Sequence, residues 1–119
     1  MLFRSLHLAE MMRNEGEVIA IDIDAKRLEE LKVRAQRAGI QIIRTELREN
    51  IVPENFVGKA HIVLVDAPCT GAGTIRRNPM FKWRVTELLV QHYSRMQSDI
   101  LFFNAQFVKP GGRLVFATC

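Results

Sequence analysis

The stretch Val18-Ile19-Ala20-Ile21-Asp22, an apolar run that ends on an acid, decides the fold. It is rich in β-branched residues and does not alternate with polar ones, which is typical of a strand buried on both faces in a parallel sheet. Asp24 can then cap a helix that Gly39 ends. The residues expected on the buried face of this helix are Leu28, Leu31, Ala35 and Ala38. The sequence thus predicts a strand, a loop and a helix in succession.

Similar strand patterns recur further along the chain. The run from Ile40 to Ile43 predicts a second strand, and the run from Ile62 to Val65 predicts a third. A last strand is expected from Leu114 to Ala117. Asp22, Asp66 and Cys119 each follow or end such a strand. Open parallel sheets bind ligands beyond the carboxyl ends of their strands, so these three residues are candidates for a site.

Two further segments have helical patterns. We expect one helix from Ser5 to Arg13 and a longer one from Val85 to Val108, which Pro110-Gly111-Gly112 is expected to stop. The apolar residues that recur along the longer helix are Leu89, Met96, Ile100, Phe103 and Phe107. Strands that alternate with helices predict an α/β class with a mostly parallel sheet and flanking helices.

The bulk composition limits the classes of protein. A chain of 119 residues with 48% hydrophobic residues is expected to form one soluble domain. Its apolar runs fall short of the roughly 20 residues of a membrane-spanning helix, so a cytoplasmic protein is expected, with no membrane partner. Two cysteines and three histidines without ligand spacing predict no metal site. Either thiol is reactive or simply buried, and counting alone does not decide between these.

The loop from Asp66 to Pro79, Asp-Ala-Pro-Cys-Thr-Gly-Ala-Gly-Thr-Ile-Arg-Arg-Asn-Pro, is the most informative polar segment. Gly71 and Gly73 permit positive φ, and Pro68 stiffens the turn that presents Cys69. Such a loop directly after a buried strand favours ligand contacts over a plain connection.

This loop, with Lys82-Trp83 after it, resembles the fourth motif of the Sun/Fmu/Nop family of RNA (cytosine-5) methyltransferases. The segment from Val18 to Arg27 is similar to the family's second motif, and the segment from Lys109 to Cys119 to the run into its sixth. The resemblance covers nearly the whole chain. It implies an incomplete Rossmann-like fold of the class I methyltransferases, which use S-adenosylmethionine as the methyl donor.

The resemblance also implies roles for both cysteines. Carbon 5 of cytosine is a weak nucleophile, so a thiolate first adds to carbon 6 and thereby activates it. The resemblance assigns this attack to Cys119 and product release to Cys69, while Asp66 faces the cofactor and the base. Asp22 matches the acid that binds the cofactor ribose. Glu46 falls where the family has an aspartate near the adenine, although this chain lacks the glycine that precedes it.

A basic segment follows the loop. The residues from 76 to 84 include no acid, and their basic members are Arg76, Arg77, Lys82 and Arg84. We expect these side chains to contact RNA phosphates, with ribosomal RNA as the expected partner. Trp83 either stacks on a base or packs under the loop, and packing is the prediction.

The family's first motif, a glycine loop that wraps the cofactor, is not found before Ser5. Residues 1–119 are therefore expected to form part of a methyltransferase catalytic domain, without this motif and without the last strands. This chain alone is expected to be impaired. One alternative is an RNA-binding remnant without catalysis. Another is a nucleotide-dependent oxidoreductase, but no GxGxxG sequence follows a strand.

Overall fold

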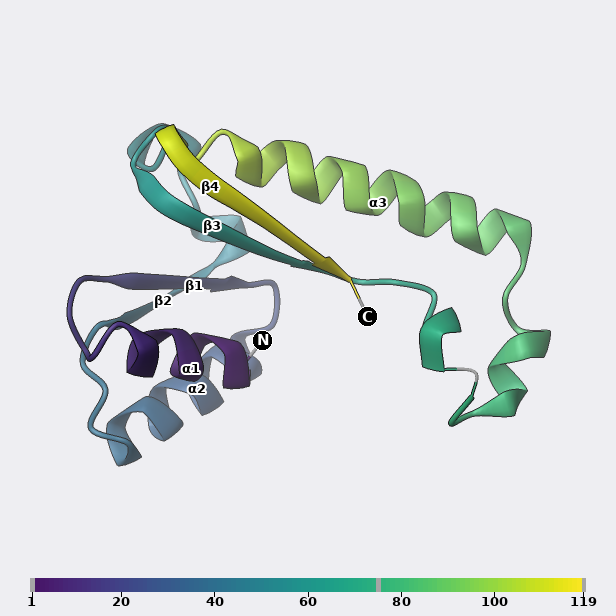
Figure 1. Ribbon diagram of the computed structural model, residues 1–119, viewed down its shortest axis with the longest axis horizontal. Helices are drawn as coiled ribbons and strands as arrows, with labels where there is room; N and C mark the ends of the chain where they lie inside the picture. The colour runs from purple at the N-terminus through teal and green to yellow at the C-terminus, as the bar shows by residue number, and fades with distance from the viewer. Residues whose placement is uncertain (1, 75, 119) are drawn as a thin grey trace. The chain divides into compact units, whose positions relative to one another are not determined.

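The computed structural model describes residues 2–74 and 76–118 (Figure 1). It divides the chain into two compact units, Met1–Val52 and Pro53–Cys119. Each unit contains one pair of parallel strands and at least one helix that packs on it. The α/β class with parallel strands and flanking helices is thereby confirmed. No helix within the described ranges has the length and apolar character needed to cross a membrane.

The first unit contains α1 (Leu2–Met11), β1 (Val18–Asp22), α2 (Ala25–Arg37) and β2 (Ile43–Leu47). The two strands are parallel, with Val18 opposite Ile43 and Asp22 opposite Leu47. Both helices contact the strands and each other. The buried apolar side chains of this unit are Ala9, Ala20, Leu28, Leu31, Ala35 and Ile51. The first predicted strand and the predicted inner face of α2 are confirmed, except for Ala38, which is exposed.

Asp24 caps α2 as predicted, because its carboxylate Oδ1 accepts a hydrogen bond of 2.9 Å from the Lys26 N–H. The other end of α2 explains why the second predicted strand is misplaced. The Gly39 N–H donates to the Gln36 carbonyl, and the Ile40 N–H donates to the Ala35 carbonyl. These two bonds form a Schellman motif, which Gly39 permits with a φ of 70°. Ile40 is thus used to end the helix, and β2 starts only at Ile43.

The second unit contains β3 (Ala60–Ala67), α3 (Glu87–Ala105) and β4 (Val108–Thr118). Among the described residues between β3 and α3 lie two short 3-10 turns, Ala72–Thr74 and Pro79–Trp83. β3 and β4 are parallel, and α3 runs alongside them in Figure 1 and contacts both. The Thr86 hydroxyl caps α3 by accepting from the Leu89 N–H at 3.2 Å.

The long helix is shorter than predicted. It ends at Ala105, and buried Phe107 then packs edge-on against Phe103 and Phe56, at centroid distances of 5.1 and 6.2 Å. Pro110-Gly111-Gly112 therefore does not stop the helix. This tripeptide lies within β4, where the register shifts: Ala60 pairs with Val108, but Ile62 pairs with Arg113. The first helix is also displaced from the prediction, since it begins at Leu2 rather than Ser5.

β3 is buried on one face only. Val65 and Ala67 are buried on the face toward α3, whereas Ile62 on the other face is 61% exposed. Val115, which pairs with Leu64, is exposed on the same side as Ile62. The apolar run from Ile62 to Val65 thus forms a strand as predicted, but only one face of this strand is buried.

Gly112 is held in a place that leaves no room for a side chain. A Cβ at this position would lie 2.8 Å from the His61 carbonyl oxygen and 2.9 Å from that of Lys109. Because both atoms belong to the backbone, neither can rotate away. We expect Gly112→Ala to lower the free energy of unfolding by about 2 kcal/mol, measured by urea titration. The control is Arg113→Ala at the exposed neighbouring position, and equal stability of the two variants would contradict the crowding.

Candidate functional site

The carboxyl ends of β3 and β4 lie at the same edge of the second unit. Ala67, near the start of the Asp-Ala-Pro-Cys loop, pairs with Thr118, the last described residue of β4. Asp66 pairs with Ala117 one step earlier. Cys119, the predicted nucleophile, lies outside the described residues. The structure therefore brings the Asp66–Cys69 loop beside the residue that precedes Cys119 in the sequence.

The thiol of Cys69 is held by its own loop. The Gly71 N–H donates to the Cys69 Sγ at 3.3 Å, and Gly71 has a φ of 78°. The next residue repeats this kind of turn, because the Thr70 Oγ1 accepts from the Ala72 N–H at 3.2 Å. Gly73 lies within the 3-10 turn Ala72–Thr74. Cys69 is half-buried, and its thiol is not part of a disulfide.

Gln97 anchors the same loop from α3. Its side-chain amide Nε2 donates to the Pro68 carbonyl oxygen at 2.8 Å. This bond joins residues that lie 29 positions apart in the sequence, and it fixes the peptide that immediately precedes Cys69. No sequence pattern pointed to Gln97, because a polar residue at this helix position is equally typical of a solvated face.

Asp66 leaves β3 on the face opposite to Val65 and Ala67, since successive side chains of a strand alternate. Its side chain is exposed. It thus shares a face with Leu64 and the strand partner Ala117, and this is the face that α3 leaves uncovered.

The first unit contains the two acids predicted to bind the cofactor. Asp22 ends β1, and its Oδ1 accepts a hydrogen bond of 3.0 Å from the Asp24 N–H. That bond orients the carboxylate beyond the strand end and occupies one of its two oxygens. The geometry fits a role in binding a ribose hydroxyl, because a carboxylate in this position still offers acceptor capacity.

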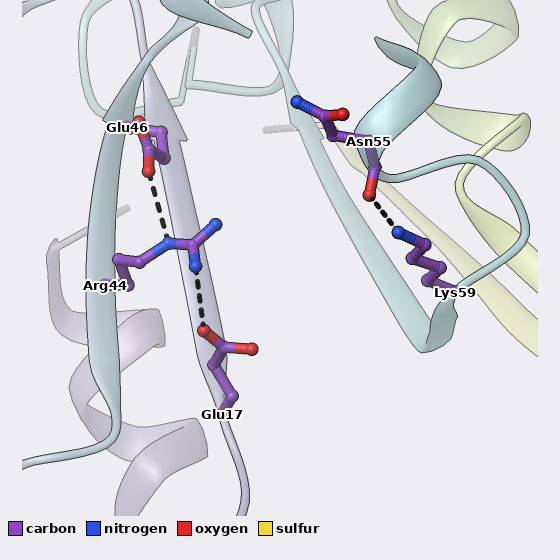
Figure 2. A network of polar contacts seen from close by, with 5 residues as sticks. All are labelled: Glu17, Arg44, Glu46, Asn55 and Lys59. Atoms are coloured by element: carbon purple, nitrogen blue, oxygen red, sulfur yellow. Dashed lines mark hydrogen bonds and ion pairs between the residues drawn. The ribbon is translucent and has the colours of Figure 1, made fainter. Parts of the chain in front are cut away.

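Glu46 has a different environment. Its Oε1 lies 3.2 Å from the Nε of Arg44, and the Nη1 of Arg44 lies 3.3 Å from the Oε1 of Glu17 (Figure 2). Arg44 and Glu46 are two residues apart on β2 and share a face of the strand. Glu46 pairs with Ile21, one residue before Asp22, so alternation directs the two predicted cofactor acids to opposite faces. The structure does not bring Asp22 and Glu46 together.

The basic segment is solvated. Arg76, Arg77, Lys82 and Arg84 are all exposed, and no ion pair described for residues 2–74 and 76–118 involves them. Trp83 is 82% exposed, so the prediction that it packs under the loop is wrong. No group of acids, histidines and cysteines among the described residues has an arrangement that holds a metal ion.

Comparison with solved structures defines the class of protein. The chain resembles a methyltransferase homologue from Pyrococcus horikoshii, with 32% identity, a TM-score of 0.76, and coverage of 95% of this chain and 34% of that one. It also resembles NSun6 from Pyrococcus horikoshii, solved with SFG, an analogue of S-adenosylmethionine. The latter match has 28% identity, a TM-score of 0.78, and coverage of 98% and 29%. The fold is that of Rossmann-like methyltransferases.

The chain belongs to the 16S rRNA methyltransferase RsmB/F family, whose model matches residues 4–119. A curated relative, the probable ribosomal RNA small subunit methyltransferase B of Bacillus subtilis, is 36% identical over 118 residues. This match covers 98% of the chain and 26% of the relative. The chain thus spans about a quarter of the length of the curated relatives that it matches. The family resemblance found in the sequence motifs is confirmed.

The hydrogen bond from Gln97 to the Pro68 carbonyl is expected to limit the reactivity of the Cys69 thiol. Gln97→Met keeps the length of the side chain but removes its donor, so we expect the loop to open and Cys69 to react several-fold faster. The rate of reaction with DTNB is measured in a Cys119→Ser background, where Cys69 is the only thiol. Gln106→Met is the matched control, because Gln106 donates a 2.8 Å bond to Phe103 away from the loop. Equal rates for both variants would show that Gln97 does not hold the loop.

Proposed function

We propose that this chain provides catalytic and substrate-binding parts of an S-adenosylmethionine-dependent methyltransferase that modifies carbon 5 of cytosine in ribosomal RNA. The observation that carries the proposal is the pairing of Ala67 with Thr118. It supports an arrangement in which both cysteines of the mechanism act at one edge of the β3–β4 pair. Membership of an rRNA methyltransferase family supports the reaction class.

The proposed reaction uses both thiols in succession. The Cys119 thiolate adds to carbon 6 of the cytosine, which makes carbon 5 electron-rich enough to take a methyl group. S-adenosylmethionine, when bound, supplies that methyl group. A base then takes the proton from carbon 5, and the electron pair of that C–H bond expels the Cys119 thiolate from carbon 6 and restores the aromatic ring. We assign this release to Cys69, a half-buried residue whose sulfur accepts from the Gly71 N–H, and we assign the orientation of the cytosine ring to Asp66.

Two acids are proposed for cofactor binding, with unequal support. Asp22 fits the ribose hydroxyls, because its carboxylate is oriented at a strand end by the Asp24 N–H. Glu46 is already paired with Arg44 at 3.2 Å. A contact between Glu46 and the adenine side of the cofactor would have to compete with this ion pair, so the structure supports Glu46 less than Asp22.

RNA is the proposed partner, and the basic segment is its proposed contact. Arg76, Arg77, Lys82 and Arg84 are exposed and offer cations to successive phosphates, a contact that carries no sequence information by itself. The cytoplasm is the proposed location. The matching relative is named as a small-subunit rRNA methyltransferase, which supports small-subunit rRNA as the substrate to test first.

A chimaera tests the proposed activity. Residues 4–119 of this chain replace the matching segment of the Bacillus subtilis relative, in cells that lack the natural enzyme. We expect 5-methylcytidine to reappear in small-subunit rRNA, detected by mass spectrometry of nucleosides. A chimaera that is folded and binds S-adenosylmethionine but leaves cytidine unmethylated would overturn the proposal. Retained RNA binding in that case would favour the alternative of an RNA-binding protein without catalysis.

Substitution of the two cysteines separates their roles in the same chimaera. Cys119→Ala removes the nucleophile, so neither the covalent RNA adduct nor 5-methylcytidine should form. Cys69→Ala removes the group assigned to release, so the adduct should accumulate and turnover should fall at least about a hundredfold. The adduct is measured as a shift of labelled RNA on a denaturing protein gel. The reverse pattern would exchange the two assignments.

Asp22→Asn tests the cofactor contact. Asparagine keeps an oxygen that accepts from the Asp24 N–H but loses the negative charge, and hydrogen bonds to charged groups are roughly twice as strong as neutral ones. We expect affinity for S-adenosylmethionine to fall about tenfold in calorimetry with the chimaera. The control is Asp99→Asn on the exposed side of α3. Equal affinity in both variants would remove Asp22 from the site.

A further inference from the structure

Trp83 is the most conspicuous side chain in this structure without an explanation from packing. It ends the 3-10 turn Pro79–Trp83 and is 82% exposed, and Met80 in the same turn is 67% exposed. Indole is the largest side chain and usually buries most of its surface, even when its N–H reaches water. An indole held almost wholly in solvent is therefore a candidate for contact with another molecule.

The charge around Trp83 restricts the chemistry of that molecule. Lys82 and Arg84 adjoin it in the sequence, and Arg76 and Arg77 precede the same turn. All four are exposed, and the residues from 67 to 86 include no acid. A flat aromatic surface among exposed cations suits a partner that carries both flat apolar rings and negative charges at short spacing. Single-stranded nucleic acid has this combination, because its unpaired bases expose their faces next to phosphates.

We propose that Trp83 is a stacking platform for an unpaired base of the RNA substrate, with Lys82 and Arg84 bound to the phosphates on either side of that base. The inference rests on the proposed function, in which RNA is the substrate, and adds that the RNA is bound as a single strand. Bases inside a duplex are stacked on their neighbours and present only their edges. The platform thus selects loops, bulges and opened strands over paired RNA.

The chain provides its own probe, because Trp83 is its only tryptophan. The complete 119-residue chain is titrated at low salt with a single-stranded oligoribonucleotide of about ten nucleotides, and separately with the same strand paired to its complement. Stacking should quench the Trp83 fluorescence strongly with the single strand and much less with the duplex. Equal quenching by both RNAs would overturn the selection for unpaired bases. Quenching by anionic lipid vesicles but not by RNA would assign the surface to a membrane instead.

Variants test whether the indole contributes to binding. Affinity is measured by the fluorescence anisotropy of end-labelled RNA, which does not depend on the protein's own tryptophan. We expect Trp83→Leu to weaken binding of the single strand about tenfold and Trp83→Phe to restore part of the loss, because a benzene ring still stacks. Phe102→Leu is the matched control, since Phe102 is 77% exposed on α3, outside the basic segment.

The possible failures are distinguishable. If RNA binds with salt-sensitive affinity but Trp83→Leu binds as tightly as the unmodified chain, the stacking proposal is wrong and the phosphate contacts of the proposed function stand. If the folded chain binds no RNA at low salt, both the stacking and the phosphate contacts are wrong. Circular dichroism of each variant shows whether it is folded.

Discussion

The parallel pairing of β3 with β4 is the constraint on which the proposed chemistry depends. Parallel strands end at the same edge, so a loop that follows one strand and a residue that follows the other are brought together without any direct bond between them. Here the hydrogen-bonded ladder sets Ala67 against Thr118. In the proposed mechanism the two thiols, Cys69 and Cys119, are about fifty residues apart in the sequence, and each follows a strand of this one ladder. α3 supports that ladder by covering one face of it and by holding the Pro68 carbonyl through Gln97.

The sequence predicted those features that depend on neighbouring residues. Asp24 caps α2, and the apolar spacing of Leu28 and Leu31 identifies the buried face, because both depend only on helical periodicity. Ile40 was misassigned because its run of apolar neighbours is equally consistent with a strand and with the end of a Schellman motif. Pro110-Gly111-Gly112 resembles a helix stop in sequence, yet its position is determined by pairing with β3. Local sequence patterns do not reveal strand partners that are distant in the sequence.

In the candidate site, too, the sequence predicted some residues and missed others. The sequence motifs identified Cys69, and the structure confirms that it lies in a tight polar turn after a strand. The roles of Cys69, Asp66 and Asp22 remain predictions, as does the assignment of residues 1–119 to one catalytic domain. Gln97 was missed because a single hydrogen bond to a distant carbonyl leaves no periodic pattern. Trp83 was assigned to packing because large aromatic residues are usually buried, and its exposure shows that the basic segment does not form a core of its own.

The register shift inside β4 limits the insertions and deletions that this strand can accept. From Ala60 to Ile62, β3 advances by two residues, whereas β4 advances by five residues between their partners Val108 and Arg113. The difference in length between the two strands is therefore an odd number of residues. Side chains of a strand alternate between faces, so this odd difference inverts the alternation of everything that follows it. Val115 consequently leaves β4 away from α3, and Phe116 leaves it on the face of Val65. The effect of an insertion or deletion between Val108 and Arg113 therefore depends on whether it changes the length of β4 by an odd or an even number of residues. A change of two residues preserves which face each later side chain joins, whereas a change of one exchanges the two faces up to Thr118.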